Sequence, residues 1–350
     1  MKKKRKTKIL SIIIILIIII SAGYFLFFYK KEENKVIENK KQVKEEKTVK
    51  VIDLNSDSRN YAVMINNASS VWGYQSGLQD AHIVYEIIVE GGYTRLMAIY
   101  KDKNLDRIGS VRSSRHYFLD YALENDAIYV HFGWSPKAQS DISQLGVDNI
   151  NFLTYSKGYE RDTSLGLSRE HTAFTSTDKI MKAADEFNYK KTSNKSNLLN
   201  YSADSVNLSN MDGAITANNI YIGYSANRST SYEYDVENKV YKRLQNNTLH
   251  TDYVTKKQYT AKNIIVYDVK NNTISGDNKN RQDINNIGSG NGYYISNGYA
   301  VPIRWTKDTR SSQTKYSYLD GTEITVNDGN TFIQIYPTNQ TLTIEWFAIE

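Results

Sequence analysis

The chain of 350 residues contains no cysteine. Without cysteine there can be no disulfide bond, no thiol nucleophile and no metal site built on thiolate ligands. A lipid anchor attached through a cysteine is excluded for the same reason. Any association of this chain with a membrane must therefore come from the polypeptide itself.

Sequence motifs of familiar enzymes are also missing. The chain has no G-x-S-x-G nucleophile elbow, no H-E-x-x-H zinc motif and no phosphate-binding P-loop. The stretch GDNKNRQDINN (276–286) is rich in acidic and amide side chains, but its spacing does not follow the order of an EF-hand calcium loop. We therefore predict no metal site and no cofactor.

The net charge of +6 comes entirely from the first eight residues. They contain six lysine or arginine side chains, so the remaining chain has equal numbers of acidic and basic residues. A basic patch for nucleic acid needs an excess of cations on the folded part. The charge balance therefore argues against nucleic acid as a partner.

An apolar run from Ile9 to Phe28 follows this basic segment. Its 20 residues match the thickness of a bilayer core, and the basic residues before it predict a cytoplasmic N-terminus. A cleaved signal peptide with a cleavage site near Ser21 is the alternative. Because the run continues to Phe28, we favour an uncleaved anchor. The predicted location is the cell membrane, crossed once, with the later residues outside the cytoplasm.

The residues after the anchor divide by composition into several parts. Residues 29–56 are polar and predict a solvated tether. Residues 57–190 alternate short β-branched or aromatic runs with helical patterns, which is typical of a mixed α/β domain. We expect strands at 61–66, 83–90, 94–100 and 127–132. Helices are expected at 113–124, 135–145 and 176–189, the second capped by Ser135 and the third by Ser176 or Thr177.

The second half of the chain has a different pattern. Residues 191–218 are rich in Ser, Asn and Lys and predict a linker. Residues 219–350 predict a β-rich domain built from hairpins. The expected turns lie at 237–238, 271–272, 297–298 and 320–321, and further strands at 330–337 and 342–349. The fold class is therefore α+β, behind an N-terminal transmembrane helix.

Several motifs in this order resemble the YerB-like family. In the first half they are QSGLQDAHIVYEIIVEGGYTRLMAIY, IGSVRSSRHYF, DAIYVHFGWSP and HTAFTS, and in the second half LHTDYVTKKQYTAKNIIVY, GSGNGYYISNGYAVPIRWTK and TFIQIYP. The resemblance implies a two-domain exported protein of Gram-positive bacteria with no assigned reaction. Family members usually have a lipid-modified cysteine, which this chain replaces with its apolar run. The flanks of His171 also differ from the family pattern.

Arginines gather around the junctions of strands and helices in the first domain. Arg112 and Arg115 lie three apart beside Ser113 and Ser114, one of which we expect to cap the helix at 113–124. Cations at a helix N-terminus oppose the helix dipole, so an anion should compensate them. This anion is either a carboxylate of the same chain or a ligand. The other candidate ligand-binding residues are Arg95, Arg161 and Arg169.

Catalytic candidates are fewer. His131 ends a predicted strand and His171 lies in a loop, so either one is a candidate general base, with Glu90 as a candidate partner. The paired acid residues Glu86 and Glu90 lie too far apart along one strand for a glycosidase.

Three functions remain open from the sequence. The first is recognition of an anionic cell-envelope polymer or a surface protein through the arginines. The second is a cell-envelope hydrolase or transferase that uses a histidine base with arginines to stabilise charge. The third is a structural scaffold whose arginines are all paired internally.

Overall fold

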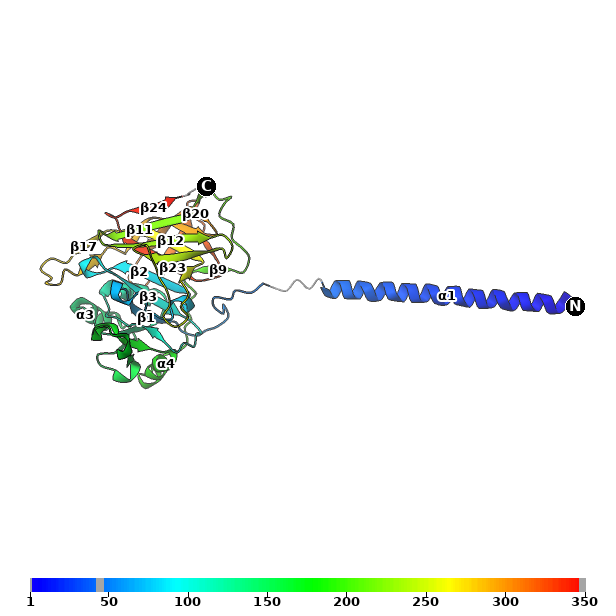
Figure 1. The fold of residues 1–350 in the computed structure, drawn as a ribbon, viewed down its shortest axis with the longest axis horizontal. Helices are drawn as coiled ribbons and strands as arrows, with labels where there is room; N and C mark the ends of the chain where they lie inside the picture. Colours follow the sequence, from blue (N-terminus) through cyan, green and yellow to red (C-terminus); the bar gives the residue numbers. More distant parts are fainter. Residues whose placement is uncertain (1, 42–46, 346–350) are drawn as a thin grey trace. The chain divides into compact units, whose positions relative to one another are not determined.

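Helix α1 (Lys2–Lys41) opens the chain in the computed structural model, which describes residues 2–41 and 47–345 (Figure 1). Its segment Ile13–Glu32 is long and apolar enough to cross a membrane. The helix continues well past the predicted anchor, so the first part of the expected tether is helical. Residues 42–46 of the tether lie outside the described residues.

The end of the expected tether belongs to the folded body. Ile52 is buried, and the backbone N–H groups of Lys50 and Val51 donate to the carboxylate of Asp328. Residues from Val49 onward form one compact unit, separate from the unit formed by residues 1–48. The prediction that residues 49–56 are a solvated spacer is therefore wrong, because an apolar side chain and an acidic partner hold them.

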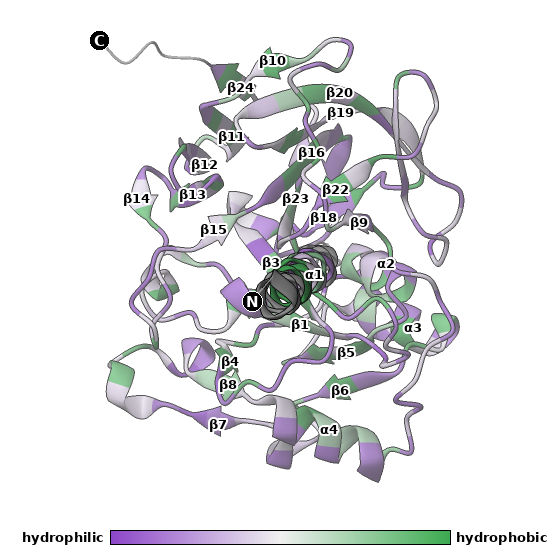
Figure 2. Ribbon diagram, turned by 90° about the vertical axis from the view of Figure 1, so that its right-hand side faces the viewer, coloured by the Kyte–Doolittle hydropathy of each residue, from purple (hydrophilic) through white to green (hydrophobic). Residues whose placement is uncertain are grey.

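One large sheet runs through the whole unit, as Figure 2 shows. Within the described residues its order is β10 (Ile215–Thr216), β20 (Tyr299–Lys307), β19 (Gly288–Ser296), β16 (Asn263–Val269), β23 (Thr331–Pro337), β2 (Ile83–Ile88), β3 (Thr94–Tyr100), β1 (Tyr61–Asn66), β5 (Ile128–His131) and β6 (Asn149–Asn151), with β21 (Lys315–Tyr318) beside β20. The strands β1, β2 and β3 are buried along their whole length, as expected where both faces of a sheet are covered.

The two predicted domains meet inside this sheet. Strand β2 pairs in parallel with β23, with Ile83 opposite Thr331. The expected linker at 191–218 contains two short strands, β9 (Asn200–Ser202) and β10, each paired with a strand from the C-terminal half. The sequence pattern changes between the halves, but the backbone hydrogen bonds join them. The α+β fold class is confirmed.

A second sheet lies in the C-terminal half. Its order is β14 (Thr248–Leu249), β13 (Val240–Gln245), β12 (Arg228–Asp235), β11 (Asn219–Ser225) and β24 (Leu342–Glu345), with β15 (Thr260–Ala261) beside β13. Tyr224 of β11 donates to Gln334 of β23, and Arg243 of β13 donates to Glu86 of β2. The second sheet therefore covers the large sheet where the two halves meet.

The remaining strands form small sheets. They are β4 (Ile108–Gly109), β8 (Ala173–Thr175) and β7 (Glu160–Arg161), then β9 with β22 (Thr325–Asn327), and β17 (Asn271–Thr273) with β18 (Gln282–Ile284). The hairpin turn at Asn297 and Gly298 is confirmed, with positive φ at both residues. The turn expected at 271–272 is wrong. Strand β16 already pairs with β19 and β23, so it has no free edge for β17.

The expected helices are present. They are α2 (His116–Glu124), α3 (Pro136–Leu145) and α4 (Thr177–Glu186). Ser135 and Ser176 cap α3 and α4 by accepting backbone N–H bonds, as predicted. The cap expected for α2 at Ser113 or Ser114 is wrong, because Arg115 takes that position. Ser114 has other partners: its N–H donates to Gly133 and its hydroxyl accepts from Tyr129.

Candidate functional site

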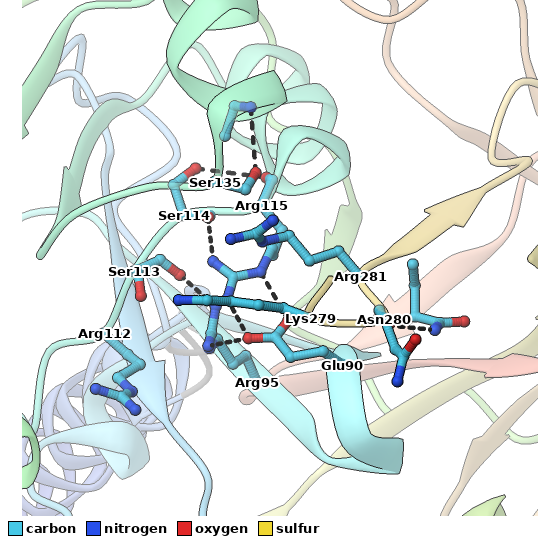
Figure 3. A network of polar contacts seen from close by, with 12 residues as sticks. Glu90, Arg95, Arg112, Ser113, Ser114, Arg115, Ser135, Lys279, Asn280 and Arg281 are labelled. Atoms are coloured by element: carbon cyan, nitrogen blue, oxygen red, sulfur yellow. Dashed lines mark hydrogen bonds and ion pairs between the residues drawn. The ribbon is translucent and has the colours of Figure 1, made fainter. Parts of the chain in front are cut away.

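Arg115 at the start of α2 and Arg95 of β3 share the carboxylate of Glu90 (Figure 3). Glu90 lies in the turn between β2 and β3. Arg115 donates two hydrogen bonds to its carboxylate: Nε donates to Oε2 at 2.8 Å, and Nη2 donates to Oε1. Arg95 of β3 donates to the same Oε1 at 3.1 Å. Both guanidinium groups are nearly buried, at 7 % side-chain exposure. Glu90 is therefore the anion that compensates Arg115 at the helix start.

The remaining donors of this corner are used by the backbone. Arg95 Nη1 donates to the carbonyl of Ser113 and Arg115 Nη1 to that of Ser114, each at 2.7 Å. Burial raises the pKa of Glu90, but the hydrogen bond from Arg115 and the charge of Arg95 outweigh it and lower the pKa to about 2. Burial and the charge of Arg115 lower the pKa of Arg95 to about 9. We call these three residues the closed cluster.

Three predicted site residues, Glu90, Arg95 and Arg115, bind one another in the closed cluster and are not available to a ligand. Arg95 and Arg115 point inward, and Glu90 has its oxygens occupied by them. Figure 3 shows that Lys279 and Arg281, which lie between β17 and β18, extend toward the same corner. Arg281 has its own partner, Asp277, at 2.6 Å.

Arg112 turns away from this cluster, as Figure 3 shows. Its Nη2 lies 2.5 Å from Oε2 of Glu170, whose side chain is 56 % exposed. Both residues line a pocket of about 510 Å³. We call it the arginine pocket, and its walls are formed by Val111, Arg112, Phe132, Phe152, Leu153, Tyr159, Arg161, Arg169 and Glu170. Three of the five predicted arginines therefore converge on one open cavity.

Aromatic rings form one side of the arginine pocket. The guanidinium carbon of Arg161 lies 5.0 Å from the ring centre of Phe132 and 5.4 Å from that of Tyr159. Arg161 Nη1 donates to the carbonyl of Arg169 and to Thr172 Oγ1, while its buried Nε has no partner among the described residues. These contacts fix Arg161 in place and leave it unneutralised by any carboxylate within the described chain.

Arg169 is exposed at the rim of the arginine pocket. Within residues 2–41 and 47–345, its side chain forms no ion pair or hydrogen bond. The pocket thus contains three guanidinium groups and a single carboxylate, Glu170. This excess of positive charge favours an anion.

His171 lies beside the arginine pocket. The amide nitrogen of Asn66 lies 2.7 Å from Nδ1, and the oxygen of the same amide accepts from the N–H of Ala68. This places the ring proton on Nε2, which lies 3.9 Å from Oε1 of Glu170. Burial and then the charge of Arg112 lower the pKa of His171, while Glu170 opposes them. The neutral ring is therefore favoured.

His131 is completely buried instead. Its Nδ1 lies 2.8 Å from the carbonyl of Gly133 and its Nε2 lies 3.1 Å from the amide oxygen of Asn149. Burial lowers its pKa to about 4. The neutral ring donates to one of these two oxygens, and both nitrogens face protein atoms in the interior, so His131 holds the turn between β5 and α3 and has no access to a substrate. The neighbouring residue, Phe132, faces the arginine pocket.

The aromatic wall was not predicted from the sequence. Phe132 and Tyr159 come from separate segments, and the strand alternation that places His131 inside also points Phe132 outward. This alternation could have indicated from the sequence that Phe132 faces outward. Among the described residues, no three His, Asp or Glu side chains gather as metal ligands.

Comparison with known proteins places this arrangement in a family. The family model "Protein of unknown function (DUF3048) N-terminal domain" matches residues 48–190, and its C-terminal counterpart matches residues 219–333. The chain belongs to the DUF3048 family. The two family models meet in the structure through the β2–β23 pairing.

DUF3048 relatives include a protein of Bacillus subtilis (strain 168) named "Putative lipoprotein YerB". It is 31% identical over 288 residues, which cover 81% of this chain and 82% of the relative. The crystal structure of YerB from Bacillus subtilis has a TM-score of 0.70 and 28% identity, and the match covers 82% of this chain and 94% of that chain. This chain has no cysteine for a lipid, but its apolar helix is consistent with membrane association.

Proposed function

We propose that this protein is anchored by one transmembrane helix and binds an anionic cell-envelope component outside the cytoplasm. The basic residues at the start of α1, ahead of its apolar segment, support this orientation. The relative's name supports membrane attachment, here through a helix in place of a lipid. The compact unit that begins at Val49 would then face the envelope.

The excess of guanidinium groups in the arginine pocket carries the proposal. Arg112, Arg161 and Arg169 face a cavity that contains one acidic side chain, Glu170. Arginine binds carboxylate and phosphate groups through two parallel hydrogen bonds, which a lysine does not provide. The aromatic wall offers an apolar surface for the rest of the ligand.

Three classes of ligand have this chemistry. Peptidoglycan stem peptides end in carboxylates, teichoic acids contain phosphates, and surface proteins present acidic side chains. Each lies within reach of a protein anchored in the membrane with its folded part outside. The shared feature is an oxyanion attached to a less polar group.

Turnover of such a ligand is the second candidate function. His171 lies next to Arg112 and Glu170, but its Nδ1 accepts from Asn66 and its Nε2 carries the proton, so the ring acts as a general base only when Asn66 releases Nδ1. His131 and Glu90 do not support it, because both are occupied by internal partners. Full pairing of the pocket arginines would have supported the scaffold hypothesis instead.

Binding assays on the full-length protein in nonionic detergent micelles test the first proposal. Purified peptidoglycan fragments, teichoic acid and acidic surface proteins are the probes. Arg169→Ala should weaken binding about tenfold, roughly 1.4 kcal/mol. Lys182→Ala removes one charge from the exposed face of α4 and is the matched control. Equal binding by both variants and the unaltered protein would remove the pocket from the proposal, and no binding to any probe would favour a scaffold.

Catalysis is tested on whichever probe binds. His171→Gln keeps a side chain that can bond Asn66 but removes the base. Loss of product formation with retained binding would support an enzyme. If the unaltered protein binds the probe and releases no product over long incubation, the protein is a binding module.

A further inference from the structure

A second open groove lies on the C-terminal half of the large sheet. It has a volume of about 460 Å³ and is formed by strands β16, β19, β20 and β23, with Leu342 of β24 and Leu319 at its edges. It shares no lining residue with the arginine pocket. The second sheet covers the large sheet at Glu86 and Gln334, whereas the groove lies where β24 ends this cover.

Strand register brings polar side chains into one row along the groove. Asn291 of β19 pairs with Arg304 of β20, and Asp268 of β16 pairs with Tyr336 of β23. Paired residues lie on the same face of a sheet, about 5 Å apart. All four residues line the groove, so a carboxylate, an amide and a guanidinium group are presented together.

These polar groups have no internal partners. Within the described parts of the chain, the side chains of Asp268, Asn291 and Arg304 form no hydrogen bond and no ion pair. Arg304 lies opposite Ser317 on its other side, so no cross-strand carboxylate neutralises it. The row therefore offers donors and acceptors that are free for a ligand.

Aromatic and apolar surface lies next to this row. Tyr293 pairs with Pro302 and with Val266 on the same face, and all three line the groove. Burial, and then the charges of Asp268 and Tyr293, raise the pKa of Tyr336 to about 12. Two half-buried tyrosines thus flank the polar row, with their rings beside the groove.

We infer that this groove binds a neutral oligosaccharide. A pyranose ring has an apolar face of C–H groups that suits an aromatic ring, and its rim of hydroxyl groups needs both donors and acceptors. Asp268 would accept from hydroxyls, Arg304 would donate, and Asn291 would do both. One carboxylate and one guanidinium group leave the row without net charge, so it does not favour a charged polymer. This inference is independent of the anion site, because neither its residues nor its chemistry are shared.

Titration with short sugar chains tests the inference. The full-length protein is placed in a detergent without a sugar head group and is titrated with chito-oligosaccharide and with cello-oligosaccharide, followed by calorimetry and saturation-transfer NMR. Binding to either supports the groove as a sugar site. Binding to the first alone identifies acetamido sugars as the ligand class, and binding to both identifies the pyranose chain itself.

Variants locate the binding. Arg304→Ala and Asp268→Asn should each weaken it about tenfold. The first removes the guanidinium donors and the second removes the charge and one acceptor oxygen, both from side chains that are partly or fully exposed. Arg169→Ala, in the arginine pocket, should leave sugar binding unchanged, and near-UV circular dichroism checks folding. The inference is overturned if neither sugar binds, or if binding persists undiminished in both groove variants. Neither result would bear on the anion site.

Discussion

The closed cluster and the arginine pocket both contain arginines, and some of these arginines are close in sequence. In the closed cluster the guanidinium groups are buried and paired, whereas in the arginine pocket they line a cavity that is open to solvent. Arg115 and Arg112 are three residues apart, yet Arg115 is 7 % exposed and bound twice by Glu90, while Arg112 lines an open cavity. Arg95 is also buried and bound by Glu90, and Arg161 and Arg169 also line the open cavity. Residue type alone therefore does not distinguish an architectural arginine from one available to a ligand.

The two groups of arginines differ in how many acceptor groups each guanidinium has and in how deeply it is buried. In the closed cluster one carboxylate and two backbone carbonyls satisfy two buried arginines. In the pocket the one carboxylate, Glu170, is more than half exposed and serves Arg112. Buried ion pairs are costly to break from one side, whereas exposed pairs contribute little. Changes at Glu90, Arg161 and Glu170 test how far the two groups of arginines differ.

The largest effect is expected for Glu90→Gln. The change leaves Arg95 and Arg115 nearly buried with no compensating charge, so the free energy of unfolding should fall by about 3 kcal/mol. Denaturant unfolding of the two proteins measures it. A loss below about 1 kcal/mol would mean that the cluster is not closed to water.

Acid should remove the advantage of the unaltered protein over Glu90→Gln. The pKa of Glu90 is about 2 in the folded protein and 4.5 ordinarily, so its carboxylate stabilises the fold above pH 4.5 and loses this contribution as the pH falls toward 2. The advantage of about 3 kcal/mol at pH 7 should shrink between pH 5 and pH 2. Unfolding curves across this range measure it, and a constant difference down to pH 2 would contradict the assignment.

Arg161→Lys tests whether the planar guanidinium group, or only its charge, is needed in the arginine pocket. Lysine keeps the charge but loses the planar group that lies over Phe132 and Tyr159. Binding of the anionic probe should weaken about fivefold, roughly 1 kcal/mol. Lys157→Arg on the exposed surface is the reverse exchange and serves as the control. Unchanged binding by Arg161→Lys would show that charge alone matters there.

The smallest effect is expected for Glu170→Gln. Its ion pair with Arg112 is exposed, so the free energy of unfolding should change by less than about 1 kcal/mol, and added salt should remove the change. The same unfolding experiment at low and high salt measures it. A salt-insensitive loss as large as that for Glu90→Gln would erase the distinction between the two arginine groups.

Local patterns predicted most elements of the first half. The strands at 61–66 and 94–100 have the expected bounds, because β-branched runs and flanking turn residues act within a few residues of each other. The caps at Ser135 and Ser176 followed from the same local logic. The cap at Ser113 or Ser114 failed, because Ser114 is bound by Gly133 and Tyr129, which come from another strand and its turn.

The site was predicted in its residue types and only partly in its geometry. Anion binding by the arginines stays a prediction, and which of them pair with Glu90 depends on a turn between β2 and β3 that meets the start of α2. His131 failed as a candidate base, because β5 lies inside a sheet with both faces covered. The aromatic wall joins β5 to loops around residues 152 and 159, and no local pattern connects them.

Composition and short-range periodicity were enough to predict the long apolar N-terminal helix, the absence of thiol chemistry and the α+β class, and the order of several motifs was enough to indicate the family. That the two halves share one sheet, and which arginines line a pocket instead of pairing with Glu90, follows only from the packed fold. Hydrogen bonds between strands such as β2 and β23, and ion pairs such as that of Glu90 with Arg115, form between residues distant in the chain. Their formation depends on which surfaces the packed fold brings together and closes to water.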